Sequence, residues 1–348
     1  MTREIVSSLG LLRMPNTKEV APDPISEERL LWFHTPTYLN TLKRAGKGIH
    51  DFKALKRGLG TPDCPLFKDM FEYSALAAGG SPHGAGMILN DEVDIAFNPS
   101  GGFHHADADG ASGFCYLNDI VIAAEMFAGS GRRVLVIDLD AHHGDGVQRA
   151  FYNRKDIVTL SMHEDGKTLF PGTGFVDEIG DGEGKGCSIN VPLPVGTFDA
   201  AYLKAFREVV QPLIEAISPG VIILVLGMDA LAGDPLAHLN LTNNVFADIV
   251  ADIVETDIPI LATGGGGYNP DNTARGWALA WSVFANGRDD AVMGFGMGGV
   301  MLENTAWFGG LRDRTLLSHG GYRTRVEKDI DETIRAIRKL VFPLHGLS

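Results

Sequence analysis

Two histidines and three aspartates lie close together in "LVIDLDAHHGDG", residues 135–146. Asp140 and His142 are separated by one residue, so an extended backbone points both side chains to the same side. A carboxylate oxygen and an imidazole nitrogen placed in this way form half of a site for a divalent metal such as zinc. Asp229, in "GMDALAGDP", is the best-placed third ligand. Each residue alone fits a turn cap equally well, but the set favours a metal site with one open position, as in catalytic zinc sites.

A second group of ionisable residues lies in "GGFHHADADGASGFCY", residues 101–116, which contains the adjacent His104 and His105. Asp138 and Asp145 stand beside the proposed metal ligands and are not themselves needed to bind the metal. A histidine whose far nitrogen donates to a carboxylate has a fixed tautomer and a raised basicity, which a general base needs. The sequence therefore predicts two His–Asp pairs.

Tyr268 follows four consecutive glycines, residues 264–267. Four glycines weaken any regular element, so they need a reason, such as a loop pressed against a site. A phenol beside a metal can donate a hydrogen bond to a developing oxyanion. Taken alone, however, "GGGGY" favours a flexible turn.

Short apolar runs precede these polar loops and predict the strands that position them. The runs are residues 93–97, 133–138, 156–161, 221–226 and 258–263. Helical patterns cover residues 116–128, 199–217 and 272–285. Alternating elements of this kind predict an α/β fold with a largely parallel central sheet and helices on both faces. Because ligands bind at the carboxyl ends of such strands, the loops can meet in one place.

Composition limits the class of protein. The chain has 348 residues, 45% of them apolar, and a net charge of -14. This charge argues against nucleic-acid binding through neutralised phosphates. Three widely spaced cysteines predict no disulfide framework and a cytoplasmic location. The N-terminus does not have the pattern of a signal peptide. The sequence contains no run of about 18 apolar residues, so we expect no membrane span.

In its motifs the chain resembles the histone deacetylase superfamily, which has the arginase/deacetylase fold, and within it the branch of bacterial deacetylases and acetoin-utilisation proteins. The resemblance covers residues of about 26–285 and rests on "GTPDCPLF", "FNPSGGFHHADADGASGFCYLND", "VIDLDAHHGDGVQ", "FPGTG", "GMDALAGDPL" and "GGGGYNPDNTARGW". It implies a single deacetylase-like domain over residues 1–348 that ends with a helix at about 328–341. The chain begins near the family's first helix, so the usual first strand is expected to be missing.

The resemblance also implies site residues. The zinc ligands are Asp140, His142 and Asp229, with Asp234 as a supporting residue. His105 is the general base and is supported by Asp145, while His104 is its electrostatic partner and is supported by Asp138. Tyr268 polarises the acetyl carbonyl. The acyl-lysine tunnel and its rim are formed by Asp63, Gly113, Phe114, Phe170 and Leu236. A structural K⁺ ion is expected at Asp138, Asp140, His142, Ser161 and Met162. Met228 replaces a residue that is often small, so the geometry of the neighbouring ligand is expected to change slightly.

The function implied is that of a zinc-dependent amidohydrolase, which removes acetyl or other acyl groups from lysine side chains of proteins or peptides. Alternatives are a deacetylase of small acetylated amines such as acetylpolyamines, and a non-catalytic acyl-lysine binding protein. A binuclear manganese ureohydrolase is disfavoured because "DAHHGD" places its aspartate one residue later than the "DAHxD" pattern. Fe²⁺ or Co²⁺ also suit two carboxylates and one imidazole. The sequence leaves open the acyl preference and the oligomeric state.

Overall fold

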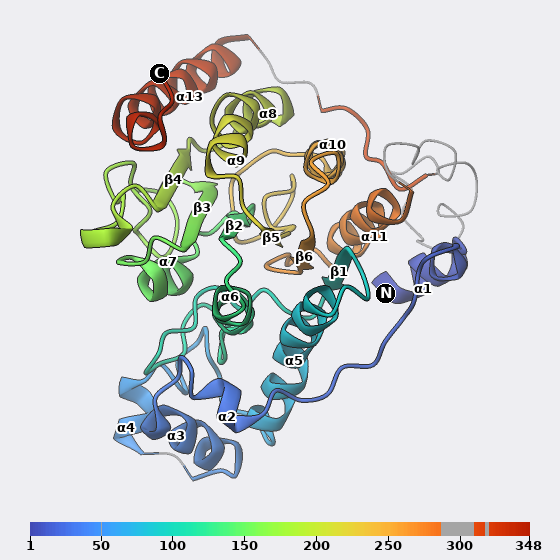
Figure 1. Cartoon of the computed structure of the whole chain (residues 1–348), viewed down its shortest axis with the longest axis vertical. Helices are drawn as coiled ribbons and strands as arrows, with labels where there is room; N and C mark the ends of the chain where they lie inside the picture. Colours follow the sequence, from blue (N-terminus) through green and yellow to red (C-terminus); the bar gives the residue numbers. More distant parts are fainter. Residues whose placement is uncertain (50, 287–309, 317–319) are drawn as a thin grey trace.

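A parallel sheet of six strands forms the centre of the computed structural model, which describes residues 1–49, 51–286, 310–316 and 320–348 (Figure 1). The strand order across the sheet is β1-β6-β5-β2-β3-β4. The strands are β1 (Ile95–Asn98), β2 (Val134–Asp138), β3 (Ile157–Glu164), β4 (Ser188–Leu193), β5 (Val221–Val225) and β6 (Ile260–Thr263). This confirms the predicted α/β fold.

Both faces of the sheet are covered, because alternate residues of β2, β5 and β6 enter different cores. In β2, Leu135 and Ile137 belong to one core, whereas Val134 and Val136 belong to the other. The first core packs against α8 (Asp199–Ala205), α9 (Gln211–Ile217), α10 (Asn243–Val254), α11 (Pro270–Asn286) and α13 (Gly320–Leu340). The second packs against α5 (Met70–Leu89), α6 (Asp119–Gly129) and α7 (Asp145–Phe151). A single π-helical turn, Phe206–Val210, joins α8 to α9.

The described residues ahead of β1 form helices and loops and contain no strand. The elements here are α1 (Thr2–Ser8), α2 (Glu27–Leu30), α3 (Pro36–Gly46) and α4 (Phe52–Lys56). Helices α2 to α4 and the start of α5 enclose a third, smaller core. Within the described parts of the chain, no helix is both long enough and apolar enough to cross a membrane.

β4 and α5 are among the elements that the sequence patterns did not predict, as are α7 and α10. β4 reads "SINVPL", in which Ser188 and Asn190 alternate with apolar residues and both donate to Gln148 of α7. The strand therefore lacks the continuous apolar run used to recognise the others. α5 is interrupted by glycines and by Pro82, which hide its helical period. Close packing explains one of these glycines, since a Cβ at Gly84 would lie 2.9 Å from Ala96 Cβ.

The order of the strands places a topological switch point between β2 and β5. From β2 the chain runs outward through β3 and β4, and it then returns to β5 on the other side of β2. In open α/β sheets, ligands bind at such a switch point, beyond the carboxyl ends of the strands. The loops after β2 and β5 carry Asp140, His142 and Asp229.

Candidate metal centre and active site

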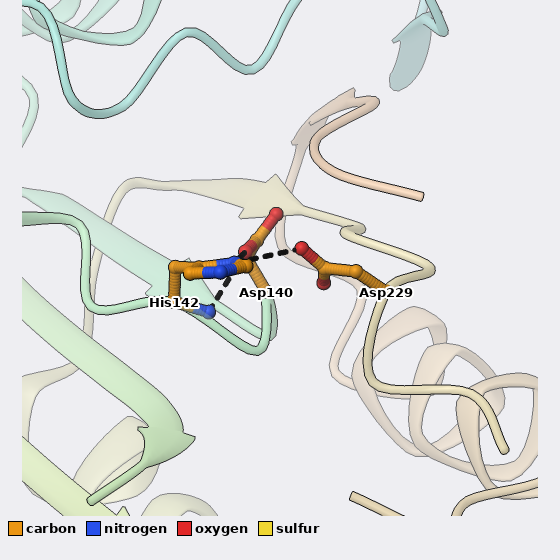
Figure 2. A group of neighbouring side chains, drawn as sticks. All are labelled: Asp140, His142 and Asp229. Atoms are coloured by element: carbon orange, nitrogen blue, oxygen red, sulfur yellow. Dashed lines mark hydrogen bonds and ion pairs between the residues drawn. The ribbon is translucent and has the colours of Figure 1, made fainter. Parts of the chain in front are cut away.

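Asp140, His142 and Asp229 meet at this switch point, as Figure 2 shows. One ligand atom of each lies within 4.8 Å of those of the other two, and all three residues are buried. His142 Nδ1 lies 2.8 Å from Asp229 Oδ2 and 3.2 Å from Asp140 Oδ1. The side chains are brought together as predicted, although residues 139–144 form an irregular loop rather than an extended strand.

Backbone hydrogen bonds hold the two carboxylates in place. Ala141 N donates to Asp229 Oδ1 at 2.9 Å, and His142 N donates to Asp140 Oδ1 at 2.9 Å. Gly266 N donates to the other oxygen of Asp140 at 2.6 Å. The site is therefore fixed by the loops themselves before any ligand binds.

The chemistry of the three donors fits a divalent cation. Burial, and next the charge of Asp140, raise the pKa of Asp229 to about 6. Burial lowers the pKa of His142, but hydrogen bonds and charge from Asp140 and Asp229 outweigh it and raise the pKa to about 10. Two buried carboxylates face one another here, and in the described part of the chain no lysine or arginine is paired with either. A metal ion would supply the missing positive charge.

The four glycines before Tyr268 form a packed wall of this site, so the interpretation as a flexible turn is wrong. A Cβ on Gly265 would lie 2.9 Å from Asp140 Oδ2, and one on Gly266 would overlap Asp229 Oδ2. Gly227, on the loop after β5, is equally confined, because a Cβ there would overlap the carboxylate of Asp140. Only glycine lets these loops approach the metal ligands so closely.

Replacing Gly266 with alanine is therefore expected to displace Asp229 and to lower the affinity for zinc by at least about 10-fold, comparable to the loss of an outer partner of a metal ligand. Zinc titration followed calorimetrically measures this affinity. Gly86→Ala is the matched control, because a Cβ at Gly86 meets nothing within 4 Å. Equal zinc affinities for Gly266→Ala and the wild type would contradict the close packing.

Two His–Asp pairs lie beside the cluster of Asp140, His142 and Asp229. His104 Nδ1 lies 2.7 Å from Asp138 Oδ2, and His105 Nδ1 lies 2.8 Å from Asp145 Oδ1. The imidazole centroids of the two histidines are 4.0 Å apart, and all four residues are buried. Each histidine thus uses Nδ1 for its carboxylate and keeps Nε2 for another partner.

The two histidines differ in their electrostatics. Burial and the positive charge of His104 lower the pKa of His105 to about 4, although Asp145 opposes the shift. Burial also lowers the pKa of His104, but Asp138 and Asp140 outweigh it and raise the pKa to about 9. Near neutral pH, His105 is the neutral imidazole, and so it is the one of the two able to accept a proton.

Tyr268 lies half-buried at the end of the glycine run. Its backbone N–H donates to Asp234 Oδ2 at 2.7 Å, and its ring centroid lies 5.4 Å from that of Phe114. Burial, and then the charges of Asp140 and Asp229, hold the pKa of the phenol well above its usual range. The hydroxyl group therefore stays protonated and can act as a hydrogen-bond donor.

Three of the residues predicted to line the acyl-lysine tunnel are exposed apolar side chains. Phe114, Phe170 and Leu236 are 44%, 47% and 41% exposed. The Phe170 ring centroid lies 5.1 Å from that of His105 and 6.4 Å from that of His142. Phe170 therefore connects the surface to the buried histidines.

Gly113 and Asp63, which were also predicted for the tunnel and its rim, lie beside His105 and Phe114. A Cβ on Gly113 would overlap the His105 ring, so this backbone lies directly against the histidine. Asp63 Oδ2 accepts a hydrogen bond from Gly113 N at 3.0 Å, and Asp63 O accepts one from Phe114 N at 3.1 Å. Asp63 thus fixes the backbone that presents the Phe114 side chain.

The residues predicted to bind K⁺ lie at the end of β2, in the loop that follows it, and in β3. Asp138 and Ser161 are directly paired across β2 and β3, and Met162 follows in β3. Asp138 and Ser161 line a small buried cavity together with Asn190. Asn190 Oδ1 is buried and accepts no hydrogen bond from the described residues.

Sequence reasoning did not find Glu164 or Arg149. Buried Glu164 accepts hydrogen bonds from His238 N at 2.8 Å and Thr168 Oγ1 at 3.0 Å, and so it ties the loop of Leu236 to that of Phe170. Arg149 Nη1 donates to Asp145 Oδ2 at 2.8 Å. Only the spacing of four residues between Asp145 and Arg149 gives a signal in the sequence.

The fold and the cluster define an α/β protein with a possible metal site at the carboxyl edge of its sheet. Residues 1–284 match the family model described as the histone deacetylase domain, and the chain belongs to this family. The homologues and the fold indicate a hydrolytic deacetylase, and zinc dependence is typical of the family. The narrower bacterial and acetoin-utilisation branch stays a prediction.

Similar proteins cover most of the chain. Histone deacetylase B of Dictyostelium discoideum is 42% identical over 284 residues, which are 81% of this chain and 67% of that protein. Histone deacetylase 9 of Arabidopsis thaliana is 42% identical over 286 residues, which are 81% of this chain and 66% of that protein. The chain thus spans about two thirds of the length of these relatives. The crystal structure of an HDAC homolog from Aquifex aeolicus is 32% identical, with a TM-score of 0.82 over 97% of this chain and 92% of that one.

Proposed function

We propose that this protein removes acetyl groups from lysine side chains of proteins or peptides, with one zinc ion held by Asp140, His142 and Asp229. The observation that carries this proposal is the position of the buried ligand cluster beside the His105–Asp145 pair, with the ring centroid of the exposed Phe170 side chain 5.1 Å from that of His105. A metal site and a neutral base are parts that amide hydrolysis requires.

The chain's own residues have separate roles in this proposal. When bound, zinc supplies a Lewis acid that polarises the acyl carbonyl and activates water. His105 Nε2 accepts the proton of the attacking water, because Nδ1 is engaged by Asp145. The Tyr268 hydroxyl group donates to the carbonyl oxygen as its negative charge develops. A protonated histidine then gives a proton to the leaving amine, and His104, held by Asp138, keeps positive charge beside His105.

In this proposal, the acyl-lysine tunnel selects an uncharged substrate side chain. Phe114 and Phe170 offer aromatic faces that suit a flat acetamide on an alkyl stem. A free lysine ammonium would lose its hydration there without gaining a counter-charge. In this proposal Asp63 is the rim residue that accepts hydrogen bonds from backbone amides of a bound peptide, and its Oδ2 also accepts one from Gly113 N at 3.0 Å. This favours acetyl-lysine in a polypeptide over a small acetylated amine.

Replacing Phe114 with alanine is expected to raise KM for an acetyl-lysine peptide by about 10-fold, because one aromatic wall is lost. The expected change in kcat is small, since the ring makes contacts that differ little between the ground and transition states. Steady-state kinetics measures both constants. Phe52→Ala is the control, because Phe52 is also exposed, at 69%, but lies on α4. An unchanged KM in Phe114→Ala would contradict the placement of the tunnel.

The experiment that tests the substrate class compares kcat/KM of the zinc-loaded protein on acetyl-lysine peptides, acetylpolyamines and longer acyl-lysines. The proposal expects the peptide to be preferred by at least about 10-fold, or 1.4 kcal/mol. A preference for acetylpolyamines would instead assign the small-amine activity. Binding of the acetyl-lysine peptide without any hydrolysis would indicate the non-catalytic binding protein.

The secondary assignments belong to the same proposal. A K⁺ ion at Asp138, Ser161 and the carbonyls of Asp140, His142 and Met162 is supported by the small cavity beside the first two. Fe²⁺ and Co²⁺ remain alternatives to zinc. We also treat residues 1–348 as one domain, because the buried face of α13 belongs to the main core. A cytoplasmic location and the absence of nucleic-acid and membrane partners stay predictions from the sequence.

A further inference from the structure

An arginine stands behind the proposed general base. Arg149, in α7, donates from Nη1 to Asp145 Oδ2 at 2.8 Å and from Nε to Asp107 Oδ2 at 2.9 Å. Asp145 is the carboxylate that engages His105, and Asp107 follows His105 by two residues on the same loop. One guanidinium group thus contacts both the partner of His105 and the loop that carries it.

The other oxygen of Asp145 is already fully engaged. Asp145 Oδ1 lies 2.8 Å from His105 Nδ1 and accepts from Gly146 N at 2.9 Å. Arg149 is therefore the side chain that fixes Oδ2, and with it the plane of the carboxylate. With Arg149 in place, the Asp145 side chain is only 9% exposed.

The helix and the histidine loop are packed tightly together. Val147 N donates to His104 O at 3.2 Å. A Cβ on Gly146 would lie 2.6 Å from both His104 O and Ala106 O, so the backbones are in contact there. A small rotation of α7 or of this loop would therefore alter the His105–Asp145 pair directly.

We propose that Arg149 is a positioning residue for His105: it holds the Asp145 carboxylate in the orientation that fixes the proton of His105 on Nδ1. Nε2 is then left free to accept a proton from water. This inference rests on the proposed function for its kinetic consequence, but the position of the proton on His105 is independent of turnover. In this proposal Arg149 acts through Asp145 and does not contact the substrate.

The test combines kinetics with ¹⁵N-histidine NMR of the metal-free protein. Arg149→Gln is expected to lower kcat by about 10-fold, the size of effect typical of outer partners at metal sites, with KM changed less than about twofold. The His105 resonances, assigned by comparison with His105→Gln, are expected to change from the Nδ1–H tautomer to a mixture. Arg149→Lys keeps the charge but lacks the fork that reaches two carboxylates, and should recover only part of kcat.

Arg154→Gln is the matched control. Arg154 also pairs with two carboxylates, Asp156 and Glu125, and is similarly exposed, but neither carboxylate touches a site histidine. Arg149 and Arg154 are 44% and 37% exposed, so we expect Tm to fall by only about 3 °C in either variant. Wild-type kcat and an unchanged His105 tautomer in Arg149→Gln would overturn the inference. The proposed function alone would be refuted if the wild type were inactive on every substrate while Arg149→Gln still changed the His105 tautomer.

Discussion

Tyr268→Phe is expected to lower kcat on an acetyl-lysine peptide by about 10²–10³-fold, or roughly 3–4 kcal/mol, the cost of one oxyanion donor. The lost hydrogen bond matters chiefly in the transition state, so KM should change little. The ring itself is retained, and with it the contact with Phe114 at 5.4 Å between centroids. Steady-state kinetics together with metal analysis measures all three quantities.

The metal content of this variant is the discriminating value. The Tyr268 side chain is not among the ligands of the cluster, so zinc should bind as in the wild type. Tyr73→Phe is the control, because Tyr73 is 70% exposed and its hydroxyl group has no assigned role. A Tyr268→Phe enzyme with near wild-type turnover would show that the tyrosine only packs within its glycine loop.

Asp229→Asn is expected to have the largest effect. It removes one of the two buried carboxylates of the cluster. Loss of a residue that only hydrogen-bonds to a metal ligand lowers activity by up to about 100-fold, so we expect loss of a ligand itself to lower it further. Zinc should also cease to stabilise the fold, because stabilisation by a ligand depends on its affinity for the native state. Thermal unfolding with and without added zinc measures this second effect independently of turnover.

The metal-free Asp229→Asn protein should itself fold normally. The substitution removes the repulsion between Asp229 and Asp140, which together with burial raises the pKa of Asp229 to about 6. Asp177→Asn, at an exposed position, should keep both the activity and the zinc-dependent rise in Tm. Full activity in Asp229→Asn would exclude this residue as a ligand.

The sequence predicted the strands that end at the site better than those far from it. β2 and β5 are continuous apolar runs whose loops carry the metal-binding residues, and this pattern requires burial on both faces. β4 escaped because Ser188 and Asn190 alternate with apolar residues to serve a buried hydrogen-bond network around Gln148. Polar side chains within a buried strand interrupt the continuous apolar run by which such strands are predicted.

Within the candidate site, the residue types predicted the chemistry but not the neighbouring residues that hold the site side chains in position. Aspartate and histidine at strand ends pointed to Asp140, His142 and Asp229, and their close approach in space needed only the parallel topology. Arg149 was missed because an arginine within a helix has the ordinary appearance of a surface residue. The role of the four glycines before Tyr268 depends on loops more than 100 residues away in sequence, as the Gly266–Asp140 hydrogen bond across 126 positions shows. No local pattern reports such a contact.

The single zinc centre and the deacetylase activity are tested together by measuring acetate release from an acetyl-lysine peptide while zinc is titrated into the metal-free protein. We expect no hydrolysis without metal, and a rise in rate that reaches its plateau at one zinc ion per chain. A plateau only at two ions per chain, or a rate unaffected by chelation, would contradict the single centre at Asp140, His142 and Asp229. Peptide binding with no acetate released at any zinc concentration would contradict the deacetylase itself.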